Sequence, residues 1–333
     1  PKLLPRAGQG RQGLWLGLRR PYSLHGGIRG LRPHRPLCAG PPGHAGPGVP
    51  GRKAHLIGRW RRTVRAAVGA GIAARHAQLC RAVALCKAQG VRYYLLGNGS
   101  NILFADEGYN GAVLDISSMQ DAVQVHGTQL TAGAGVRLSV LCKTALEHSL
   151  TGLEFAYGIP GTVGGAVYMN AGAYGGEMKD VLTTVQYLTA EGEVKGATAA
   201  ELDLRYRHSI FEENGGCILS AQFALTPGEP EAIRAKMDEL MAKRLDKQPL
   251  DKPSAGSTFK RPVGAFAAAL IDQCGLRGYR HGGAAVSEKH CGFVVNLGGA
   301  TCADVLALCD EVRAVVKEKT GYDLEKEIRV VKA

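Results

Sequence analysis

The sequence predicts a protein of two domains that mix strands and helices, and three observations support this. The chain has 333 residues, which is enough for two domains with cores of their own. Short strand patterns and helical patterns alternate from residue 78 onward. The composition changes around Pro227 and Pro230, where a long helical pattern with acidic residues in its first turn begins. We therefore expect a first domain over residues 77–227 and a second over residues 228–333.

Residues 1–76 differ from the rest of the chain in charge. They hold 15 of the 41 Lys and Arg residues and no Asp or Glu, so the remainder carries 26 basic and 29 acidic residues, a net charge of −3. The overall charge of +12 thus comes from this segment, and the rest of the chain does not favour a nucleic-acid partner. We interpret the segment as disordered or as an out-of-frame translation, with a basic arm for nucleic acid or membrane as the alternative.

The nine cysteines form no CxxC pair, and most stand beside aliphatic residues. Buried free thiols have such neighbours, so we expect a reduced protein without structural zinc. No apolar run approaches the length of about 18 residues that a membrane helix needs. The chain also lacks a signal-peptide pattern. These features predict a cytoplasmic protein without a membrane partner.

The first domain is expected to open with a short helix from Gln78, with Gly90 just beyond its last turn. A strand over residues 91–96 follows and leads directly into the loop GNGSN at residues 97–101. Glycine permits alternating backbone conformations, and Asn and Ser add donors, so this loop can form a nest of N–H groups around an anion. It is neither a P-loop nor a Rossmann fingerprint, and a plain turn is the alternative.

The glycine-rich stretch over residues 152–176 comes after two more predicted strands, at residues 112–116 and 130–135, and a predicted helix at residues 138–146. Eight of its 25 residues are glycine, interleaved with apolar side chains, so it is not a flexible linker. Pro160 suits the first turn of a short helix whose free N–H groups point at an anion. A structural turn in a strand-rich domain is the alternative.

The remaining patterns predict strands over residues 181–188, 201–205 and 217–223, then the helix that opens the second domain. A helix near residues 266–274 follows, and Thr301 and Asp304 resemble a capping box for a further helix that ends at Gly321. The closing strand over residues 323–331 places Glu325, Glu327 and Arg329 on the face opposite its apolar residues.

Three polar clusters lie far apart in the sequence: YRHS at residues 206–209, AGSTFK at residues 255–260 and EKEIR at residues 325–329. By itself each has a plain interpretation, as a surface arginine, a hydroxyl-stabilised turn or a solvated strand face. Together with the two glycine-rich loops they resemble the ordered motifs of a known family. GNGSN, GIPGTVGGAVYMNAGAYG, YRHSIF, SAGSTFKRP, GGAAVSEKHCGFVVN and LEKEIRVV are similar to the motifs of the UDP-N-acetylenolpyruvoylglucosamine reductases, the MurB-type UDP-N-acetylmuramate dehydrogenases.

The resemblance covers residues 78–331 and implies an α+β fold, with an FAD-binding domain of the vanillyl-alcohol-oxidase type (PCMH-like) followed by a smaller α+β substrate-binding domain. It implies that NADPH reduces FAD, and that the enolpyruvyl ether of a UDP-sugar is then reduced to UDP-N-acetylmuramate for peptidoglycan synthesis. The short interval between Arg207 and Ser257 resembles the subgroup without an extra tyrosine-bearing loop. We expect the enzyme to be a monomer.

Residue roles are carried over from the family motif by motif. Ser257 is expected to protonate the substrate carbon next to the carboxylate, while Arg207 and Glu327 assist by stabilising charge or sharing a proton. Contacts to the substrate are implied for Tyr174, Lys260 and Arg261, with solvated loop charges as the alternative for the two cations. Contacts to FAD are implied for Gly97, Asn98, Gly99, Ser100, Asn101, Gly161, Thr162, Val163, Gly164, Gly165, Asn170, Gly172 and Ala173.

One departure from the family leaves alternatives open. Family members usually have a Thr-x-Phe-x-x-Gly-Gly-like strand before the first helix, and residues 1–76 contain no match to it. An inactive flavoprotein without this first strand is therefore one alternative, and an FAD oxidoreductase of the same fold for a different substrate is another. A metal site at His281 and His290 is disfavoured because no compatible ligand cluster surrounds them.

Overall fold

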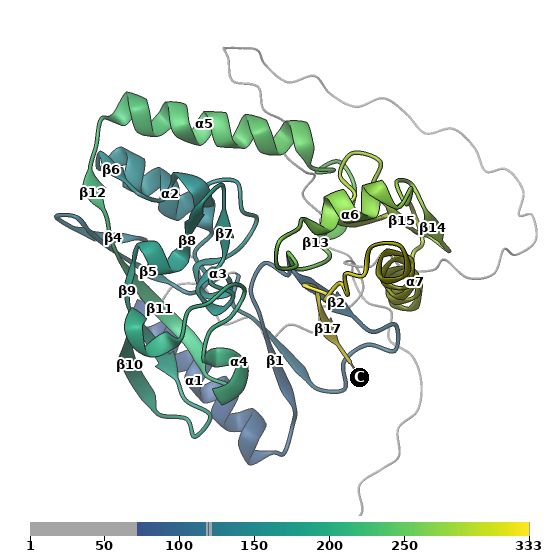
Figure 1. Ribbon diagram of the computed structural model, residues 1–333. Helices are drawn as coiled ribbons and strands as arrows, with labels where there is room; N and C mark the ends of the chain where they lie inside the picture. Colours follow the sequence, from purple (N-terminus) through teal and green to yellow (C-terminus); the bar gives the residue numbers. More distant parts are fainter. Residues whose placement is uncertain (1–71, 118, 120–121, 333) are drawn as a thin grey trace, which may run out of the picture. The chain divides into compact units, whose positions relative to one another are not determined.

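The computed structural model describes residues 72–117, 119 and 122–332 (Figure 1). Nearly all of the basic segment predicted over residues 1–76, including the place where the first strand was sought, lies outside the described residues. The first helix begins at Ile72, before the expected Gln78. The described helices are α1 (Ile72–Ala88), α2 (Leu138–Glu147), α3 (Val163–Tyr168), α4 (Phe211–Asn214), α5 (Pro230–Lys247), α6 (Ala267–Gln273) and α7 (Cys302–Thr320), with 3-10 turns η1 (Glu154–Ala156), η2 (Met178–Asp180) and η3 (Ala199–Leu202).

A five-stranded antiparallel sheet forms the centre of the first domain, in the order β10-β9-β11-β5-β4. Its strands are β4 (Gln124–His126), β5 (Gln129–Gly133), β9 (Leu182–Leu188), β10 (Val194–Thr198) and β11 (Cys217–Ala224). In the register, Ala221 of β11 faces Ala132 of β5 and Val185 of β9. The strand predicted over residues 201–205 is wrong, because η3 and a turn at Asp203, with φ of 45°, occupy this region.

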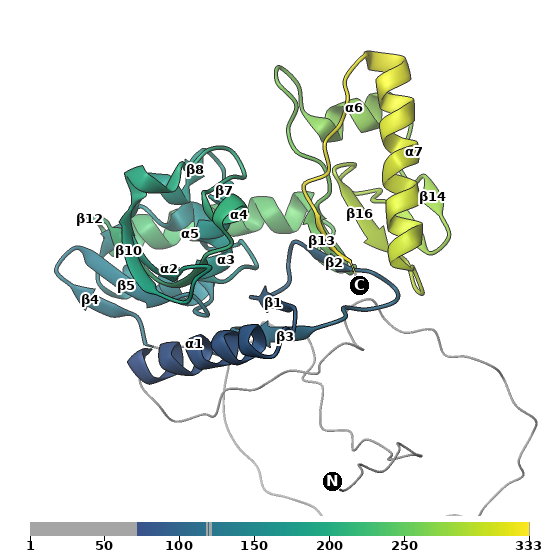
Figure 2. The ribbon, with the colours of Figure 1, turned by 90° about the horizontal axis from the view of Figure 1, so that it is seen from below.

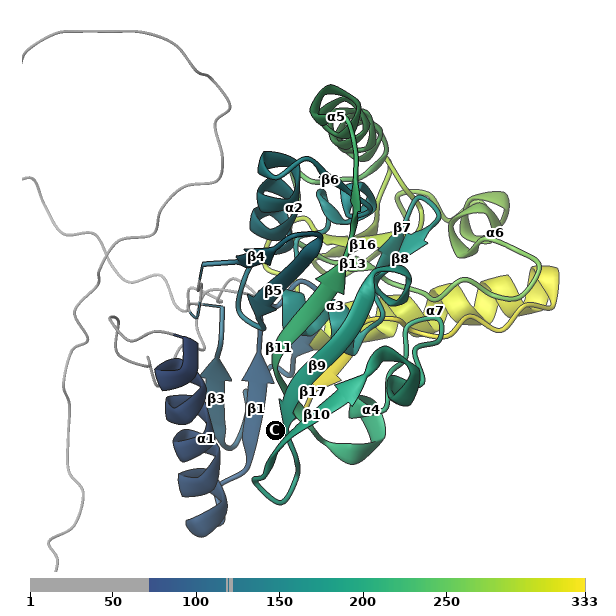
Figure 3. The same cartoon turned by 90° about the vertical axis from the view of Figure 1, so that its left-hand side faces the viewer.

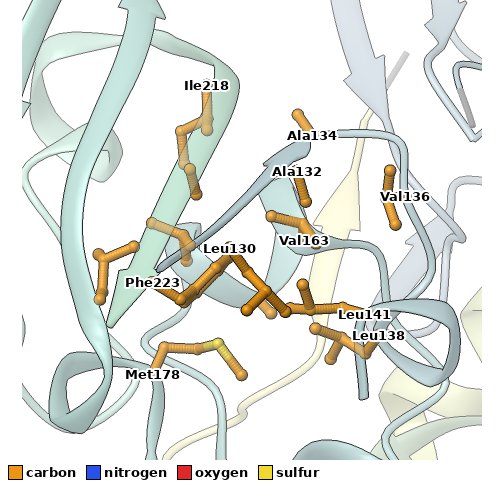
Figure 4. Close-up of a cluster of buried hydrophobic side chains, with 14 of the residues drawn as sticks. Leu130, Ala132, Ala134, Val136, Leu138, Leu141, Val163, Met178, Ile218 and Phe223 are labelled. Atoms are coloured by element: carbon orange, nitrogen blue, oxygen red, sulfur yellow. The ribbon is translucent and has the colours of Figure 1, made fainter. Parts of the chain in front are cut away.

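The core of this domain lies between the sheet and α2 and α3 (Figure 4). Leu130 and Phe223 from neighbouring strands are fully buried there, and Val163 at the start of α3 is buried beside them. The apolar positions predicted for the helix over residues 138–146 are confirmed, since all of them are buried: Leu138, Leu141, Cys142, Ala145 and Leu146. The helical spacing of apolar residues thus identified the face that packs on the sheet.

Four short strand pairs connect the loops around this sheet. The parallel pair β1 (Tyr93–Leu96) and β3 (Ala112–Asp115) lies next to α1 (Figure 3). The parallel pair β2 (Ile102–Phe104) and β17 (Arg329–Val331) places Arg329 opposite Ile102. The antiparallel pairs are β6 (Leu150–Thr151) with β12 (Thr226–Pro227) and β7 (Gly172–Ala173) with β8 (Gly176–Glu177). The pairing of β2 with β17 brings the last strand of the chain to the end of the loop 97–101.

The C-terminal domain consists of a four-stranded antiparallel sheet with α6 and α7 (Figure 2). Its strand order is β13 (Ser254–Ser257), β16 (Phe293–Asn296), β15 (Ala284–Val286) and β14 (Arg280–His281). The capping box predicted at Thr301 and Asp304 is confirmed, with each side chain bonded to the backbone N–H of the other. Gly321 ends α7 with φ of 78°, a left-handed conformation that favours glycine. This helix packs Leu308 into the second core.

Helix α5 corrects the expected domain boundary. Its buried residues Ile233 and Met237 belong to the core of the first domain, and the helix contacts η1, α2 and β6. The prediction ended the first domain at residue 227 because the composition changes there. That change marks the start of an amphipathic helix rather than the start of a new core, so we place the boundary after Lys247.

Eight cysteines in the described part of the chain are free thiols, and six of them are buried. Burial raises the pKa of Cys217 and of Cys309 to about 12, which keeps both thiols protonated and unreactive at neutral pH. Among the described helices, none has the length and apolar character that a bilayer crossing needs.

Candidate active site

A cavity of about 1010 Å³ collects most of the predicted site residues. Its wall includes the loop 97–101, much of the glycine-rich stretch, the turn at Tyr206 and Arg207, and strand β13. Among the described residues, it is lined by one carboxylate, Glu327, and by five cationic side chains: Arg207, Arg244, Lys247, Arg261 and Arg329. This excess of positive charge suits a ligand with several negative charges, such as a nucleotide diphosphate.

The loop 97–101 lines the cavity with unused backbone donors. Within the described part of the chain, none of its five N–H groups donates to a protein acceptor. Gly99 has φ of 69°, so the loop has the change of backbone sign expected for a nest. Both ends of the loop are held in place, because Asn98 donates to the Pro160 carbonyl at 2.5 Å and Asn101 donates to the Glu327 carbonyl at 3.2 Å. The loop therefore presents a fixed row of donors to the cavity.

The second glycine-rich segment supports the first loop rather than supplying free N–H groups. Helix α3 begins at Val163, with Thr162 as its N-cap, and Pro160 lies before it. The N–H groups of Val163 and Gly164 donate to the carbonyls of Val136 and Ala134 at 2.8 and 2.9 Å. The N–H group of Gly165, the third residue of the helix, donates to the Thr162 hydroxyl at 3.4 Å. The predicted helix with free N–H groups for an anion is therefore wrong.

The two glycine loops approach each other at Gly97 and Thr162. A Cβ built on Gly97 would lie 2.6 Å from the Thr162 hydroxyl oxygen, too close for any real contact. Gly97, Gly161, Thr162, Gly164 and Gly165 all line the cavity at this approach. Glycine at position 97 is thus required by the packing of one loop on the other, since its φ does not require it.

Two residues predicted to contact the cofactor do not line the cavity. Val163 is fully buried in the first core. Asn170 is also fully buried, and its amide donates to Glu177 at 2.7 Å and to the Arg205 carbonyl at 3.1 Å, while its oxygen accepts from the Lys179 N–H at 2.9 Å. Asn170 therefore fixes the turn that follows it, and Gly172, Ala173 and Tyr174 from that turn line the cavity.

Arg207 and Glu327 form an ion pair across the cavity wall, although 120 residues separate them in sequence. Arg207 Nε donates to Glu327 Oε1 at 2.6 Å, and the two side chains are only 18% and 10% exposed. Burial raises the pKa of Glu327, and the nearby guanidinium of Arg207 opposes this shift. The pair therefore places a guanidinium and a carboxyl group of raised pKa side by side in the cavity wall.

Ser257 lies at the end of β13, beside this pair. Its hydroxyl donates to the Phe259 carbonyl at 3.4 Å, a long hydrogen bond. The next residue, Thr258, holds the strand in place, because its buried hydroxyl accepts from the Val294 N–H at 2.8 Å and its carbonyl accepts from the Glu327 N–H at 2.8 Å. Ser257, Arg207 and Glu327, which the sequence placed in three separate motifs, therefore line one cavity.

The two loop cations predicted to contact the substrate differ in position. Arg261 lines the cavity, where its guanidinium lies 4.6 Å from the centre of the exposed Phe266 ring. Its N–H donates to the Tyr206 hydroxyl at 3.0 Å. Lys260 does not line the cavity and pairs instead with Glu325 at 2.6 Å. The structure thus brings Arg261 to the site and leaves Lys260 in a surface ion pair.

Several residues that line the cavity, among them the cations Arg244, Lys247 and Arg329, were absent from the predicted site. Arg244 follows the buried residues of α5 at helical spacing, so a cation on an apolar face was the signal that could have found it. It is 9% exposed, donates to the Gly158 carbonyl at 2.5 Å and has no partner for Nε in the described part of the chain. Arg329 stacks on the Tyr168 ring at 4.9 Å. His290 accepts from the Gly292 N–H, and burial lowers its pKa.

These residues fit a flavin dinucleotide. The N–H groups of the loop 97–101, which have no protein acceptor within the described residues, suit a diphosphate, and Gly97, Gly161, Gly164 and Gly165 line the cavity there. A family model described as FAD binding domain matches residues 70–198. Fold and site together define an FAD-dependent oxidoreductase with a separate C-terminal domain that completes the site.

Comparisons with known proteins identify the family. A model described as the C-terminal domain of UDP-N-acetylenolpyruvoylglucosamine reductase matches residues 248–331. The chain is 50% identical to the UDP-N-acetylenolpyruvoylglucosamine reductase of Agathobacter rectalis over 266 residues, which are 76% of this chain and 85% of that protein. It is 46% identical to the enzyme of Streptococcus pneumoniae over 254 residues, 76% of this chain and 84% of that protein.

A solved structure of similar fold is that of UDP-N-acetylenolpyruvylglucosamine reductase (MurB) from Thermus caldophilus. Its TM-score with this chain is 0.63 at 38% sequence identity, over 74% of this chain and 88% of that one. The chain belongs to the UDP-N-acetylenolpyruvoylglucosamine reductase family. The resemblance drawn from the motifs and the expected α+β FAD-binding fold are therefore confirmed.

Proposed function

We propose that this chain catalyses the NADPH-dependent reduction of UDP-N-acetylglucosamine enolpyruvate to UDP-N-acetylmuramate, a step of peptidoglycan precursor synthesis, with FAD as cofactor. One observation carries the proposal: Arg207, Ser257 and Glu327 line the same cavity as the unpaired N–H groups of the loop 97–101. The names of the similar proteins support the same substrate. The five cations of the cavity favour this polyanionic substrate over an uncharged sugar or alcohol.

The loop 97–101 and the segment around Thr162 are proposed to hold FAD. The five backbone donors of the loop are the groups available to the pyrophosphate, and Gly161, Gly164 and Gly165 provide a flat wall beside them. FAD, when bound, supplies the centre that accepts hydride from NADPH and delivers it to the enolpyruvyl substrate. The chain's part is to bind and orient both partners in the cavity.

Arg207 is proposed to stabilise the negative charge that develops on the substrate. Hydride addition to the methylene carbon leaves an electron pair beside the carboxylate, so the intermediate has enolate character. A guanidinium held at a fixed place in a half-buried site stabilises such charge without having to reorganise. The bond to Glu327 at 2.6 Å holds Nε of Arg207, which leaves its terminal N–H groups free for the substrate carboxylate.

Ser257 is proposed to deliver the proton that completes the reduction. Among the described residues, its hydroxyl is held only by the long bond to the Phe259 carbonyl, so it can turn toward the substrate carbon without losing a strong partner. A serine hydroxyl is a weak acid and needs a proton source behind it. Glu327 can act as that source, because burial raises the pKa of its carboxyl group and it lies on the strand segment paired with residues 258–260.

Arg244, Lys247 and Tyr174 are proposed to bind the phosphates of the nucleotide substrates. The Tyr174 hydroxyl interacts with the buried Arg244 guanidinium and opposes the lowering of its pKa by burial. Arg244 Nε has no partner within the described residues, and Lys247 lies one helical turn further along α5. Arg261, which also lines the cavity, is proposed to contact the same substrates. We expect Arg244→Met to raise KM for NADPH and for the UDP-sugar, with a smaller change in kcat.

Stopped-flow absorbance of the purified protein tests the proposal. The enzyme should contain FAD, NADPH should bleach it, and UDP-N-acetylglucosamine enolpyruvate should restore the colour in a single turnover with formation of UDP-N-acetylmuramate. Ser257→Ala should slow this second step by about 100-fold, as expected on loss of a general acid. Ser149→Ala, outside the cavity lining, is the matched control and should remain close to wild type.

Two outcomes would contradict the proposal. Protein that is colourless and retains no FAD after reconstitution would identify an inactive flavoprotein. Protein whose reduced flavin is reoxidised by another acceptor, but not by the UDP-sugar, would identify an oxidoreductase for a different substrate. We also propose that the enzyme acts in the cytoplasm as a monomer, since one chain contributes all the groups invoked above. Size-exclusion chromatography with light scattering tests the monomer.

A further inference from the structure

His208 stands next to Arg207 and has no part in the chemistry proposed above. Its side chain is 16% exposed and lies between two carboxylates. Nδ1 is 3.1 Å from Glu212 Oε2, and Nε2 is 3.2 Å from Asp203 Oδ2. Asp203 comes from the turn before it and Glu212 from α4, so the ring joins two elements.

The charged groups around His208 provide partners for both of its protonation states. Arg205 Nη2 lies 3.0 Å from Nε2 and 2.6 Å from Asp203, and Glu213 lies 3.8 Å from Nε2. The neutral ring can donate from Nδ1 to Glu212 while Nε2 accepts from Arg205. The charged ring has no lone pair for Arg205 and donates to both carboxylates, so only this form joins Asp203 directly to Glu212.

This cluster holds the turn that presents Arg207 to the cavity. Arg207 has φ of 55°, a left-handed conformation that neighbouring contacts must maintain in a residue with a side chain. The N–H groups of Arg205 and His208 donate to the carbonyls of each other, at 3.3 and 3.1 Å, and close the turn around Arg207. Ser209 donates to the Tyr168 carbonyl at 2.7 Å and fixes its far side.

The same cluster reaches a second cavity arginine. Glu212, the partner of His208 Nδ1, also forms an ion pair with Arg329 Nη2. Arg329 lines the cavity and stacks on Tyr168. His208 therefore connects to two of the five cations of the site. It is next to Arg207 in sequence, and Glu212 joins it to Arg329.

We propose that His208 is a positioning residue for the reduction: its ring lies between Asp203 and Glu212, links the turn to α4 and so holds Arg207 and Arg329 in place. The role rests on the proposed function of the cavity. Without the ring at position 208, the link between Asp203 and Glu212 is lost. Arg207 is then held less firmly for the step in which negative charge develops.

The test compares His208→Gln with a matched control. Gln keeps a donor group and an acceptor group but lacks the second ring nitrogen that faces the other carboxylate. His281→Gln is the control, because His281 Nδ1 lies 2.8 Å from Glu311 on α7 and this pair is outside the cavity lining. We expect His208→Gln to slow single-turnover oxidation of the reduced enzyme by the UDP-sugar by about tenfold per bound flavin, as for a misplaced catalytic group, with KM nearly unchanged.

Either of two results with active enzyme overturns the proposal. In the first, His208→Gln keeps the wild-type rate per bound flavin. In the second, a lower FAD content or a lower melting temperature fully explains its loss of rate, which would make His208 merely structural. If wild-type protein does not reduce the UDP-sugar, the proposed function fails and NMR decides this inference separately. The Arg207 Nε–H resonance can be assigned by its loss in Arg207→Lys. It should then shift in His208→Gln and not in His281→Gln. An unchanged resonance in His208→Gln would contradict the positioning role.

Discussion

The contact between Gly97 and Thr162 makes a sharp prediction about the FAD site. In Gly97→Ala the new Cβ would lie 2.6 Å from the Thr162 hydroxyl oxygen, whereas real Cβ contacts are essentially never below 3.0 Å. One loop must therefore move by at least about 0.4 Å, or Thr162 must change rotamer. A changed rotamer removes the N-cap bond to Gly165, which costs about 1 kcal/mol of stability. A moved loop displaces the donors of residues 97–101.

The expected effect on FAD is larger than the effect on folding. Loss of one hydrogen bond to a charged group costs about 1.5–3 kcal/mol, so the FAD dissociation constant should rise by about tenfold or more. Fluorescence titration of the apoprotein with FAD measures this dissociation constant. Urea denaturation of the apoprotein measures the free energy of unfolding. Gly196→Ala in β10 is the control, because its nearest neighbour would be 3.8 Å away and it is outside the cavity lining.

A double-mutant cycle tests the reasoning directly. Thr162→Ala removes the hydroxyl that the new Cβ would strike, so adding Gly97→Ala to this background should cost little further stability or affinity. Equal costs of Gly97→Ala in both backgrounds would refute the steric explanation. Unchanged FAD affinity in Gly97→Ala, in spite of the displaced loop, would refute the assignment of this loop to the cofactor.

Three further predictions concern stability. Thr258→Val should lower the free energy of unfolding by about 1–3 kcal/mol in urea, because it leaves the buried Val294 N–H without its acceptor, and an unchanged midpoint would contradict this. The folded-state pKa of Glu327 is raised above 4.5, so wild-type stability should fall as pH rises through that folded value, and urea titrations of Glu327→Gln should show a flatter profile. The Thr301 N–H and hydroxyl lower the pKa of Asp304 below 3.8, so its stabilisation is present above that value and lost in acid; Asp304→Asn should flatten the acid limb seen by circular dichroism.

Sequence patterns predicted the local features of the fold well. The apolar spacing of α2, the capping box at Thr301 and the glycine end of α7 depend on residues within a few positions of one another. The family motifs also identified the chemistry, because they preserve residue types in order along the chain. The boundary at residue 227 was misplaced for a physical reason: composition shows where α5 begins, but only packing shows that Ile233 belongs to the first core.

Within the site, the sequence by itself determined which residue types were available, and the tertiary structure decided which of them face the cavity. GNGSN could be proposed as a nest, with a plain turn as the alternative, because glycine sets local backbone freedom. The equally suggestive helix start at Val163 turned out to have its donors engaged by the segment between β5 and α2, which no local pattern records. Arg207 and Glu327 lie 120 residues apart, and their contact exists only because β17 returns to pair with β2. Local conformation depends on neighbours in sequence, whereas burial, partner and charge environment depend on neighbours in space.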